Sequence, residues 1–261
     1  MGGIRRRRLA ALLLGVWLLA AGCGGGDRQD GAQAPAPTTI APATTAAADA
    51  VPVDKGCLEA DEQAKAFRFR AGGGDTVGLA LGSGRDGIVL GHQSGSDLCE
   101  WLPQARSFAG QGYRVLLFDF PPGSTITRDV VAATGELRRR GASEVVLVGS
   151  SMGGAAVLAA ATRISPPVAG VVSLSAPHEY LDADAQAAAG RLRVPVLFVA
   201  AEDDPPFDDD ARAMYRAATV GDKRLLILPA GGHGTSLLEF GDQAAKVRSA
   251  VTGFLRAHLG G

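Results

Sequence analysis

The sequence predicts an α/β fold with a doubly wound, mostly parallel sheet of eight strands and helices on both faces. From residue 66 onward, short apolar, β-branched runs alternate with longer amphipathic stretches, the order that strand–helix–strand units require. The run at 145–148 is apolar at every position, which is expected of a strand covered on both sheet faces. These two patterns determine the predicted fold class.

The expected elements follow in chain order. Residues 67–70 and 76–81 flank a glycine-rich turn and predict an antiparallel hairpin. Further strands are expected at 88–91, 114–118, 145–148, 168–174, 196–200 and 225–228. Helices are expected at 98–109, 128–140, 151–162, 208–218 and 243–258. Gly141 suits the end of the second helix, and the three aspartates that begin the fourth suit the positive end of its dipole.

Residues 1–23 predict an export signal. A basic stretch at 1–8 precedes an apolar stretch at 9–21 that is too short for a permanent membrane span. The segment ends in Leu-Ala-Ala-Gly-Cys23, which resembles a bacterial lipobox, in which the cysteine carries lipid and becomes the mature N-terminus. An ordinary signal peptide with an incidental cysteine is the alternative. We expect an exported protein anchored by lipid to the outer face of the bacterial cell membrane or envelope.

The remaining chain divides into a tether and a domain. Residues 24–53 are rich in Ala, Pro and Thr, a composition that cannot bury enough apolar surface to order itself and that predicts a disordered tether. Residues 54–261 suit a single domain. This domain contains Cys57 and Cys99, and an even pair in an oxidising compartment predicts a disulfide. Two buried free thiols are the alternative.

Charge and histidine spacing exclude two classes of ligand. Lys and Arg number 26 against 27 Asp and Glu, so no basic field points to nucleic acid. The histidines show no zinc-type spacing with cysteine, and no metal is expected. They are His92, His178, His233 and His258.

The G-x-S-x-G motif at 149–153 is the strongest indication of a catalytic residue. It lies between an apolar strand and an alanine-rich helix. A sharp strand-to-helix turn lifts the Ser151 hydroxyl above the sheet edge, and the flanking glycines permit a crowded backbone. The helix N-terminus favours negative charge, and the N–H of Met152 can donate to an oxyanion. The context predicts Ser151 as a nucleophile; a purely structural turn is the alternative.

With this motif, residues 66–259 resemble the α/β-hydrolase superfamily, and most closely its small esterases related to the dienelactone hydrolases, with serine in place of the nucleophilic cysteine. Residues 88–93 (Ile-Val-Leu-Gly-His-Gln) match the position of the family's oxyanion loop. The resemblance implies that the backbone N–H of Gln93 is the second oxyanion donor, although the usual His-Gly pair here reads Gly-His. His92 precedes the nucleophile in the chain and is expected to be structural.

Two later loops resemble the family's acid and histidine loops. In Glu-Asp-Asp-Pro at 202–205, Asp204 stands immediately before the proline and is the best match for the triad acid, with Asp203 as the alternative. His233 follows the last expected strand and has glycines on both sides. A solvated acidic loop and an exposed loop histidine are the alternatives. The order Ser, Asp, His is that of the superfamily.

Two departures from the family concern the pocket. The usual glycine-rich sequence after the fourth strand is replaced by Asp-Phe-Pro-Pro-Gly-Ser-Thr at 119–125, which implies a different pocket wall. The segment between the strands at 168–174 and 196–200 is too short for a large helical cap, so an open site is expected. His178 and Tyr180 in this segment either line the pocket or lie on the surface.

The resemblance implies a carboxylesterase-like serine hydrolase that cleaves small-molecule acyl esters through an acyl-enzyme intermediate. Ser151, His233 and Asp204 would form the triad, with no cofactor and no metal. The only further partner expected is the membrane, through the N-terminal lipid. Thioester or amide hydrolysis by the same triad is one alternative. A non-catalytic envelope lipoprotein on a hydrolase fold is the other.

Overall fold

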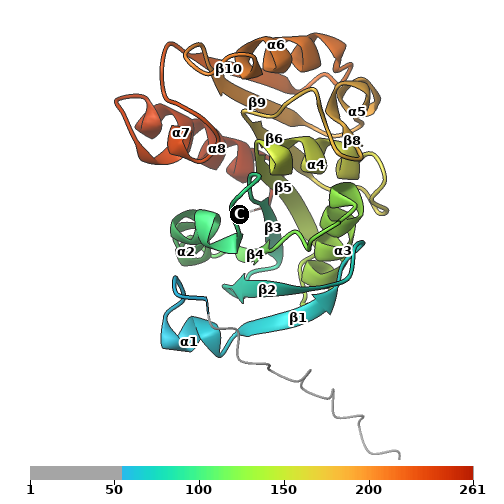
Figure 1. Cartoon of the computed structure of the whole chain (residues 1–261), viewed down its shortest axis with the longest axis vertical. Helices are drawn as coiled ribbons and strands as arrows, with labels where there is room; N and C mark the ends of the chain where they lie inside the picture. The colour runs from blue at the N-terminus through green and yellow to red at the C-terminus, as the bar shows by residue number, and fades with distance from the viewer. Residues whose placement is uncertain (1–54, 261) are drawn as a thin grey trace, which may run out of the picture. The chain divides into compact units, whose positions relative to one another are not determined.

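The structure is a computed structural model that describes residues 55–260 of the 261-residue chain (Figure 1). The predicted export signal with Cys23 and the whole of the predicted tether at 24–53 lie outside the described residues. The helices found between residues 55 and 260 include none that is both long and apolar enough to cross a membrane.

The centre of the domain is an eight-stranded sheet in the order β1-β2-β4-β3-β5-β6-β9-β10. The strands β1 and β2 form an antiparallel hairpin, β2 runs antiparallel to β4, and the other neighbours are parallel. Their bounds are β1 Ala66–Arg70, β2 Asp75–Leu81, β3 Asp86–Gly91, β4 Arg114–Phe118, β5 Glu144–Ser150, β6 Gly170–Leu174, β9 Val196–Ala201 and β10 Lys223–Leu228. The predicted fold class and strands are confirmed, with each strand boundary within two residues.

The helices that pack on this sheet are those expected, together with several short elements. The expected helices are α2 Leu102–Gly110, α3 Ile126–Arg139, α4 Met152–Ala161, α6 Phe207–Ala217 and α8 Ala244–His258. The additional elements are α1 Ala60–Gln63, α5 Ala185–Arg191, α7 Ser236–Glu239 and a small hairpin of β7 Glu179–Tyr180 and β8 Ala183–Asp184. These are too short to produce a recognisable period in the sequence.

One expected helix is divided in two. The segment predicted as a single helix at 98–109 begins with a 3₁₀ turn, η1 Leu98–Trp101, and only then becomes α2. Pro103 lies in the first turn of α2 and has no N–H to bond back to the turn before it, so the α-helix starts where that loss costs nothing.

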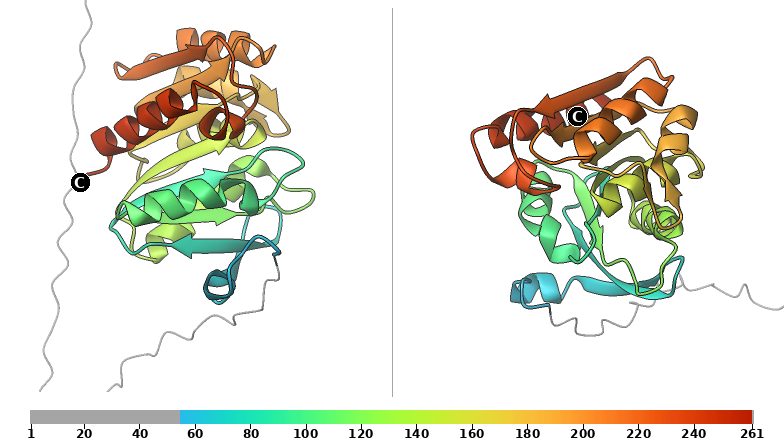
Figure 2. Two further views of the ribbon diagram at one scale, coloured as in Figure 1. Left: turned by 90° about the vertical axis from the view of Figure 1, so that its left-hand side faces the viewer. Right: turned by 45° about the horizontal axis from the view of Figure 1, so that its top comes forward.

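Two cores lie on opposite faces of the sheet. On β5, Val145 and Leu147 belong to the core under α3, α4, α5 and α6, whereas Val146 and Val148 belong to the core under η1, α2, α7 and α8. Figure 2 shows α2 and α8 together in front of the sheet. Because side chains alternate along a strand, coverage on both faces requires apolar residues at consecutive positions, and residues 145–148 in the middle of β5 are all apolar.

The first described residues are fastened to η1. A disulfide joins Cys57 to Cys99 across 42 residues of chain, and Lys55 Nζ lies 2.8 Å from Asp97 Oδ2 and 2.6 Å from Asp119 Oδ2. The disulfide pairing expected from the sequence is therefore the one in the structure.

Removing this disulfide should lower stability substantially. The combined change Cys57→Ser and Cys99→Ser is expected to lower the free energy of unfolding by about 4 kcal/mol, because the bond restricts the unfolded chain over that loop. Urea unfolding of the variant beside oxidised and reduced wild type measures the loss. Two alkylatable thiols at these positions in the non-reduced wild type would contradict the pairing.

Asp129, in the first turn of α3, is a fully buried carboxyl group. Its Oδ1 accepts from the N–H of Gly73 at 3.1 Å, and its Oδ2 has no partner among residues 55–260. Burial raises the pKa of Asp129, against the lowering effect of hydrogen bonds from Ser124 and Gly73. The folded state therefore holds its proton to higher pH than the unfolded state does. The contribution of this group to stability falls as pH rises above the ordinary aspartate value and stays reduced at neutral pH.

Asp129→Asn should accordingly raise the melting temperature at pH 7 and leave it nearly unchanged near pH 2.5, where the carboxyl is neutral in both states. The exposed Asp209 provides a matched control, for which Asp209→Asn should change little at either pH. Thermal unfolding at the two pH values makes the comparison. A lower melting temperature for Asp129→Asn at pH 7 would show that the carboxylate's hydrogen bonds outweigh its desolvation.

Candidate active site

Ser151 occupies a strained turn between β5 and α4. Its backbone lies at φ 49° and ψ −115°, a region that residues with side chains seldom adopt. Its N–H donates to the carbonyl of Leu174 at 2.8 Å. The strand, the sharp turn and the helix are the arrangement that the motif predicted, and they set the side chain at the carboxyl end of the parallel strands.

The two motif glycines are required by close backbone contacts. A Cβ on Gly149 would lie 2.2 Å from the carbonyl oxygen of Gly153, and a Cβ on Gly153 would lie 2.2 Å from that of Gly91. Any larger residue would push α4 away from the ends of β5 and β3. The glycines thus bring the helix N-terminus, Ser151 and the loop after β3 close together.

His233 and Asp204 form a hydrogen-bonded pair. His233 follows β10 and Asp204 follows β9, and His233 Nδ1 lies 2.7 Å from Asp204 Oδ2. The flanking Gly232 and Gly234 have φ of 74° and 60°, the left-handed conformation that lets the loop turn on both sides of the histidine. The ring of Phe207 packs on the imidazole with centroids 4.4 Å apart. A donor at Nδ1 leaves Nε2 as the basic nitrogen.

Asp203, the alternative acid, has a different partner. Its carboxylate accepts the backbone N–H groups of Gly231 and Gly232 at 3.2–3.4 Å. It shapes the loop that carries His233, and the structure assigns the contact with the imidazole to Asp204. The sequence did not predict these contacts of Asp203 with the backbone of the His233 loop.

The two predicted oxyanion donors differ in their surroundings. Met152 is the first residue of α4, where backbone N–H groups have no partner within the helix; within residues 55–260 its N–H has no acceptor. The N–H of Gln93, in contrast, donates to Glu100 Oε2 at 2.9 Å. In this structure Gln93 is therefore not a free donor. To act as the predicted oxyanion donor, the N–H of Gln93 has to break its hydrogen bond to Glu100 and donate to the oxyanion instead.

His92 has its ring nitrogens occupied by the backbone. Nδ1 lies 2.8 Å from the carbonyl oxygen of Gln93, and Nε2 lies 3.0 Å from the N–H of Phe120. The residue is only 4% exposed. It joins the loop after β3 to the loop after β4, which agrees with the structural role expected for it.

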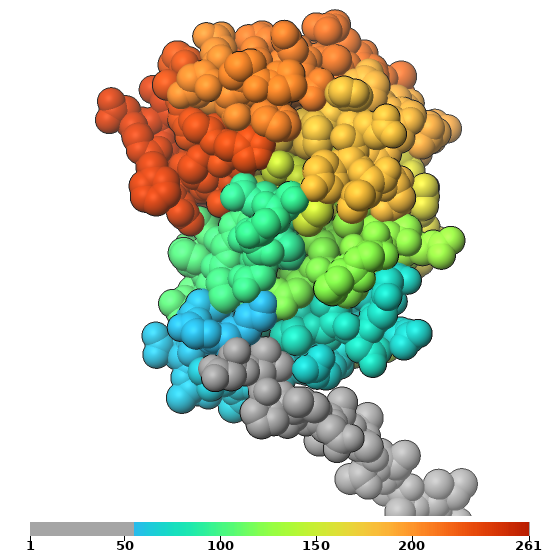
Figure 3. Space-filling view, in the orientation of Figure 1, coloured from blue at the N-terminus to red at the C-terminus, as the bar shows by residue number. Residues whose placement is uncertain are grey.

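The short segment after β6 reaches the loop after β3. The hydroxyl of Tyr180 donates to Ser94 Oγ at 2.8 Å, whereas His178 is bonded through Nδ1 to Asp210 of α6 at 3.1 Å. Figure 3 shows the green loop after β3, the yellow segment after β6 and the red-orange segment around α7 next to one another on one face. Of the two residues left open by the sequence, Tyr180 borders the candidate site and His178 fastens the segment to α6.

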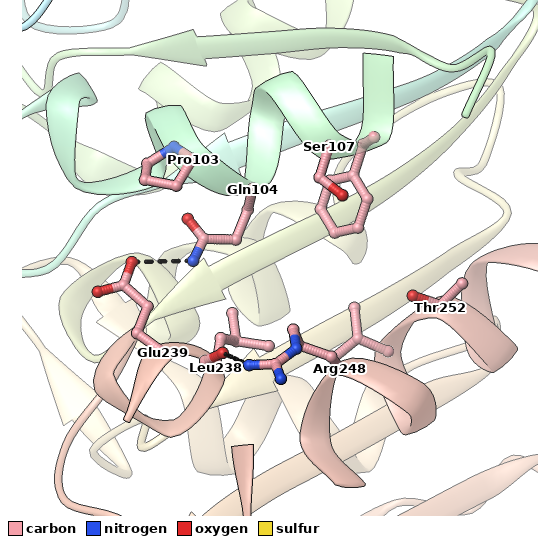
Figure 4. A pocket seen from close by; sticks show the side chains of 9 residues that line it. Pro103, Gln104, Ser107, Leu238, Glu239, Arg248 and Thr252 are labelled. Carbon is pink, nitrogen blue, oxygen red and sulfur yellow. Dashed lines mark hydrogen bonds between the residues drawn. The ribbon is translucent and has the colours of Figure 1, made fainter. Parts of the chain in front are cut away.

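A separate hollow of about 370 Å³ lies between α2, α7 and α8 (Figure 4). Phe108, Leu238 and Val251 give it an apolar lining, and Gln104 Nε2 bonds to Glu239 Oε1 at its edge at 2.9 Å. None of the predicted site residues lines it. Between residues 55 and 260, no cluster of three or more His, Cys, Asp and Glu side chains has an arrangement that could hold a metal ion.

Comparison with known proteins agrees with the fold. The model of the dienelactone hydrolase family matches residues 123–228. No curated protein matches the sequence significantly. Among solved structures, the dienelactone hydrolase of Anabaena variabilis is 23% identical, with 75% of this chain and 99% of that chain covered and a TM-score of 0.60. The esterase domain of a Rhodothermus marinus protein is 22% identical, with 74% and 98% covered and a TM-score of 0.61. An esterase of Pyrococcus furiosus is 15% identical, with 75% and 90% covered and a TM-score of 0.65.

The protein thus has the α/β-hydrolase fold, and its central part matches the dienelactone hydrolase family. The resemblance stated from the sequence is confirmed. The family match supports a hydrolase that acts on ester or lactone substrates.

Proposed function

We propose that the protein is a serine hydrolase that cleaves carboxylic esters through an acyl-enzyme intermediate. The observation that carries this proposal is the pair of His233 and Asp204, bonded at 2.7 Å at the same end of the parallel sheet as the strained turn of Ser151. A histidine with only a structural role would need neither a carboxylate hydrogen-bonded to Nδ1 nor a strained serine turn at the same edge of the sheet. Ester hydrolysis uses both.

The expected reaction has two halves. His233 Nε2 takes the proton of Ser151 Oγ as the oxygen attacks the ester carbonyl, and it then gives that proton to the departing alcohol. Water then gives a proton to the same nitrogen as it attacks the acyl carbonyl, and that proton passes to Ser151 Oγ as the bond to the acyl group breaks and the acid departs. Asp204 holds the imidazole in the tautomer with Nδ1 protonated and stabilises the imidazolium that forms in each half.

The oxyanion is expected at the N-terminus of α4. The N–H of Met152 donates to it, and the helix dipole favours the negative charge. Gln93 adds a second donor only if its N–H turns from Glu100 toward the oxyanion. The 21 residues between β6 and β9 form only a two-stranded hairpin and α5, which favours small esters that approach an open edge.

Labelling with a fluorophosphonate tests this proposal, because such a probe phosphonylates an activated serine and not an ordinary one. We expect stoichiometric labelling of the folded wild-type protein, with the modified peptide containing Ser151. Boiled protein is the control and should remain unlabelled. A folded wild type that neither takes up the probe nor hydrolyses any small acyl ester would refute the proposed function.

We further propose that the enzyme is a lipoprotein held at the outer face of the bacterial membrane or envelope through Cys23. The basic and apolar segments before this cysteine and the small residues next to it support the proposal. Wild-type protein expressed in a bacterial host should partition into the detergent phase, and Cys23→Ala should remain in the aqueous phase. Equal partitioning of the two proteins into the aqueous phase would contradict lipid attachment.

A further inference from the structure

The turn η1 fastens four separate parts of the fold through four consecutive residues. It lies directly after the loop that follows β3, on the face of the sheet that α2 and α8 cover. The N–H of Leu98 donates to Asp119 Oδ1 at 2.9 Å, and Cys99 forms the disulfide with Cys57. The carboxylate of Glu100 accepts from Gln93 and Ser150. Trp101 Nε1 donates to the carbonyl of Gly91 at 2.9 Å.

Glu100 is the member of this turn that reaches the candidate site. Its Oε2 accepts the N–H of Gln93 at 2.9 Å, and its Oε1 accepts the hydroxyl of Ser150. Ser150 is fully buried and immediately precedes Ser151. One carboxylate therefore joins the loop after β3 to the turn that carries the proposed nucleophile.

In the described part of the chain, no cation pairs with this carboxylate. Within residues 55–260, Glu100 takes part in no salt bridge, and the side chain is only partly exposed. Its two hydrogen bonds have to offset the cost of removing charge from water, and bonds to an ionised group are strong enough to do so. These two hydrogen bonds hold the Glu100 carboxylate in place, and they thereby hold the loop after β3 at a set distance from the turn of Ser151.

We infer that Glu100 is a positioning residue of the proposed hydrolase, on whose reaction the inference rests. Its carboxylate sets the distance between the loop after β3 and the turn of Ser151. Attack by Ser151 on the bound ester depends on this distance, because a displacement of about 1 Å can reduce the rate on the order of 10²-fold. Glu100 touches neither substrate nor reacting atoms. Its loss should therefore lower kcat and leave ground-state binding almost unchanged.

Two substitutions distinguish the effect of the length of the Glu100 side chain from the effect of its charge. Glu100→Asp keeps the charge but shortens the side chain, so the carboxylate cannot hold both partners. Glu100→Gln keeps the length: the amide oxygen accepts from Gln93, and the amide NH₂ donates to Ser150 Oγ, whose hydroxyl rotates away. Glu62→Asp is the matched control. Glu62 is a buried glutamate whose carboxylate accepts hydrogen bonds from Arg106 and not from residues of the candidate site.

The measurements are kcat and KM for nitrophenyl acetate and the inhibition constant of a trifluoromethyl ketone, which forms a tetrahedral adduct with an activated serine. For Glu100→Asp we expect kcat to fall roughly 10²-fold, the inhibition constant to rise in parallel, and KM to stay within about twofold. Glu100→Gln should keep at least about a fifth of the wild-type kcat. Glu62→Asp should keep the wild-type kcat even if it melts at a lower temperature.

Three results would overturn the inference: a Glu100→Asp variant with wild-type kcat, one with higher kcat, or a loss confined to KM. Higher kcat would mean that Glu100 withholds the N–H of Gln93 from the oxyanion. A Glu100→Gln variant as impaired as Glu100→Asp would also contradict the inference, because Gln keeps the length of the side chain and position alone would then not account for the loss. A wild type that shows neither turnover nor fluorophosphonate labelling would instead remove the proposed function, and the inference with it.

Discussion

Ser151→Ala is expected to abolish hydrolysis of nitrophenyl acetate and to leave the fold intact. Loss of the nucleophile removes the acyl-enzyme route, and in other serine hydrolases such a loss costs on the order of 10⁶-fold in kcat. The left-handed turn at φ 49° strains alanine about as much as it strains serine, since both carry a Cβ. The variant should therefore melt close to the wild type.

Steady-state kinetics, fluorophosphonate labelling and circular dichroism together measure this result. Ser143→Ala is a suitable control, because that serine lies in the loop before β5 and bonds to the carbonyl of Arg85. It should keep wild-type turnover. If a well-folded Ser151→Ala protein turned over ester at the wild-type rate, the proposed mechanism could not be correct.

Asp204→Asn should produce the second large effect, a loss in kcat of roughly 10⁴-fold, the size seen when a triad acid elsewhere is amidated. The carboxylate accepts a hydrogen from His233 Nδ1 at 2.7 Å. An amide that presents its NH₂ at this position would favour the tautomer with Nε2 protonated, which cannot accept the serine proton. An amide also cannot stabilise the imidazolium as a carboxylate does.

The neighbouring Asp203→Asn provides the matched comparison. Its carboxylate accepts backbone N–H groups from the His233 loop, and an amide oxygen still accepts one of them. We expect a loss of about tenfold or less. Parallel kinetics on the two variants, with thermal unfolding as the folding check, decide between them. If Asp203→Asn were the inactive variant, the pairing of His233 with Asp204 would not be the catalytic one.

Local pattern predicted much of this protein. The central strands β3, β4, β5, β6 and β9 follow from short apolar runs, because strands buried on both faces leave few positions for polar residues. The turn of Ser151 follows from its two glycines, since only they fit the close backbone approach. Asp204 was preferred over Asp203 because it precedes Pro205, and the structure places Asp204 on the imidazole.

What the sequence determined by itself is therefore the fold class, the strand–turn–helix around Ser151 and the identity of the residues that could form a triad. These depend on hydrophobic period, glycine and proline, which act within a few residues of chain.

Only the tertiary structure decided that Glu100 holds the N–H of Gln93, that Asp203 supports the histidine loop and that Tyr180 meets Ser94. Each of these contacts except that of Glu100 with Gln93 joins segments at least 28 residues apart. The Glu100 contact spans only seven residues, but it depends on the 3₁₀ turn of η1, which a regular helical pattern does not distinguish from an α-helix. Hydrogen bonds of this kind depend on how loops meet after the sheet has formed, and local residue patterns do not contain that information.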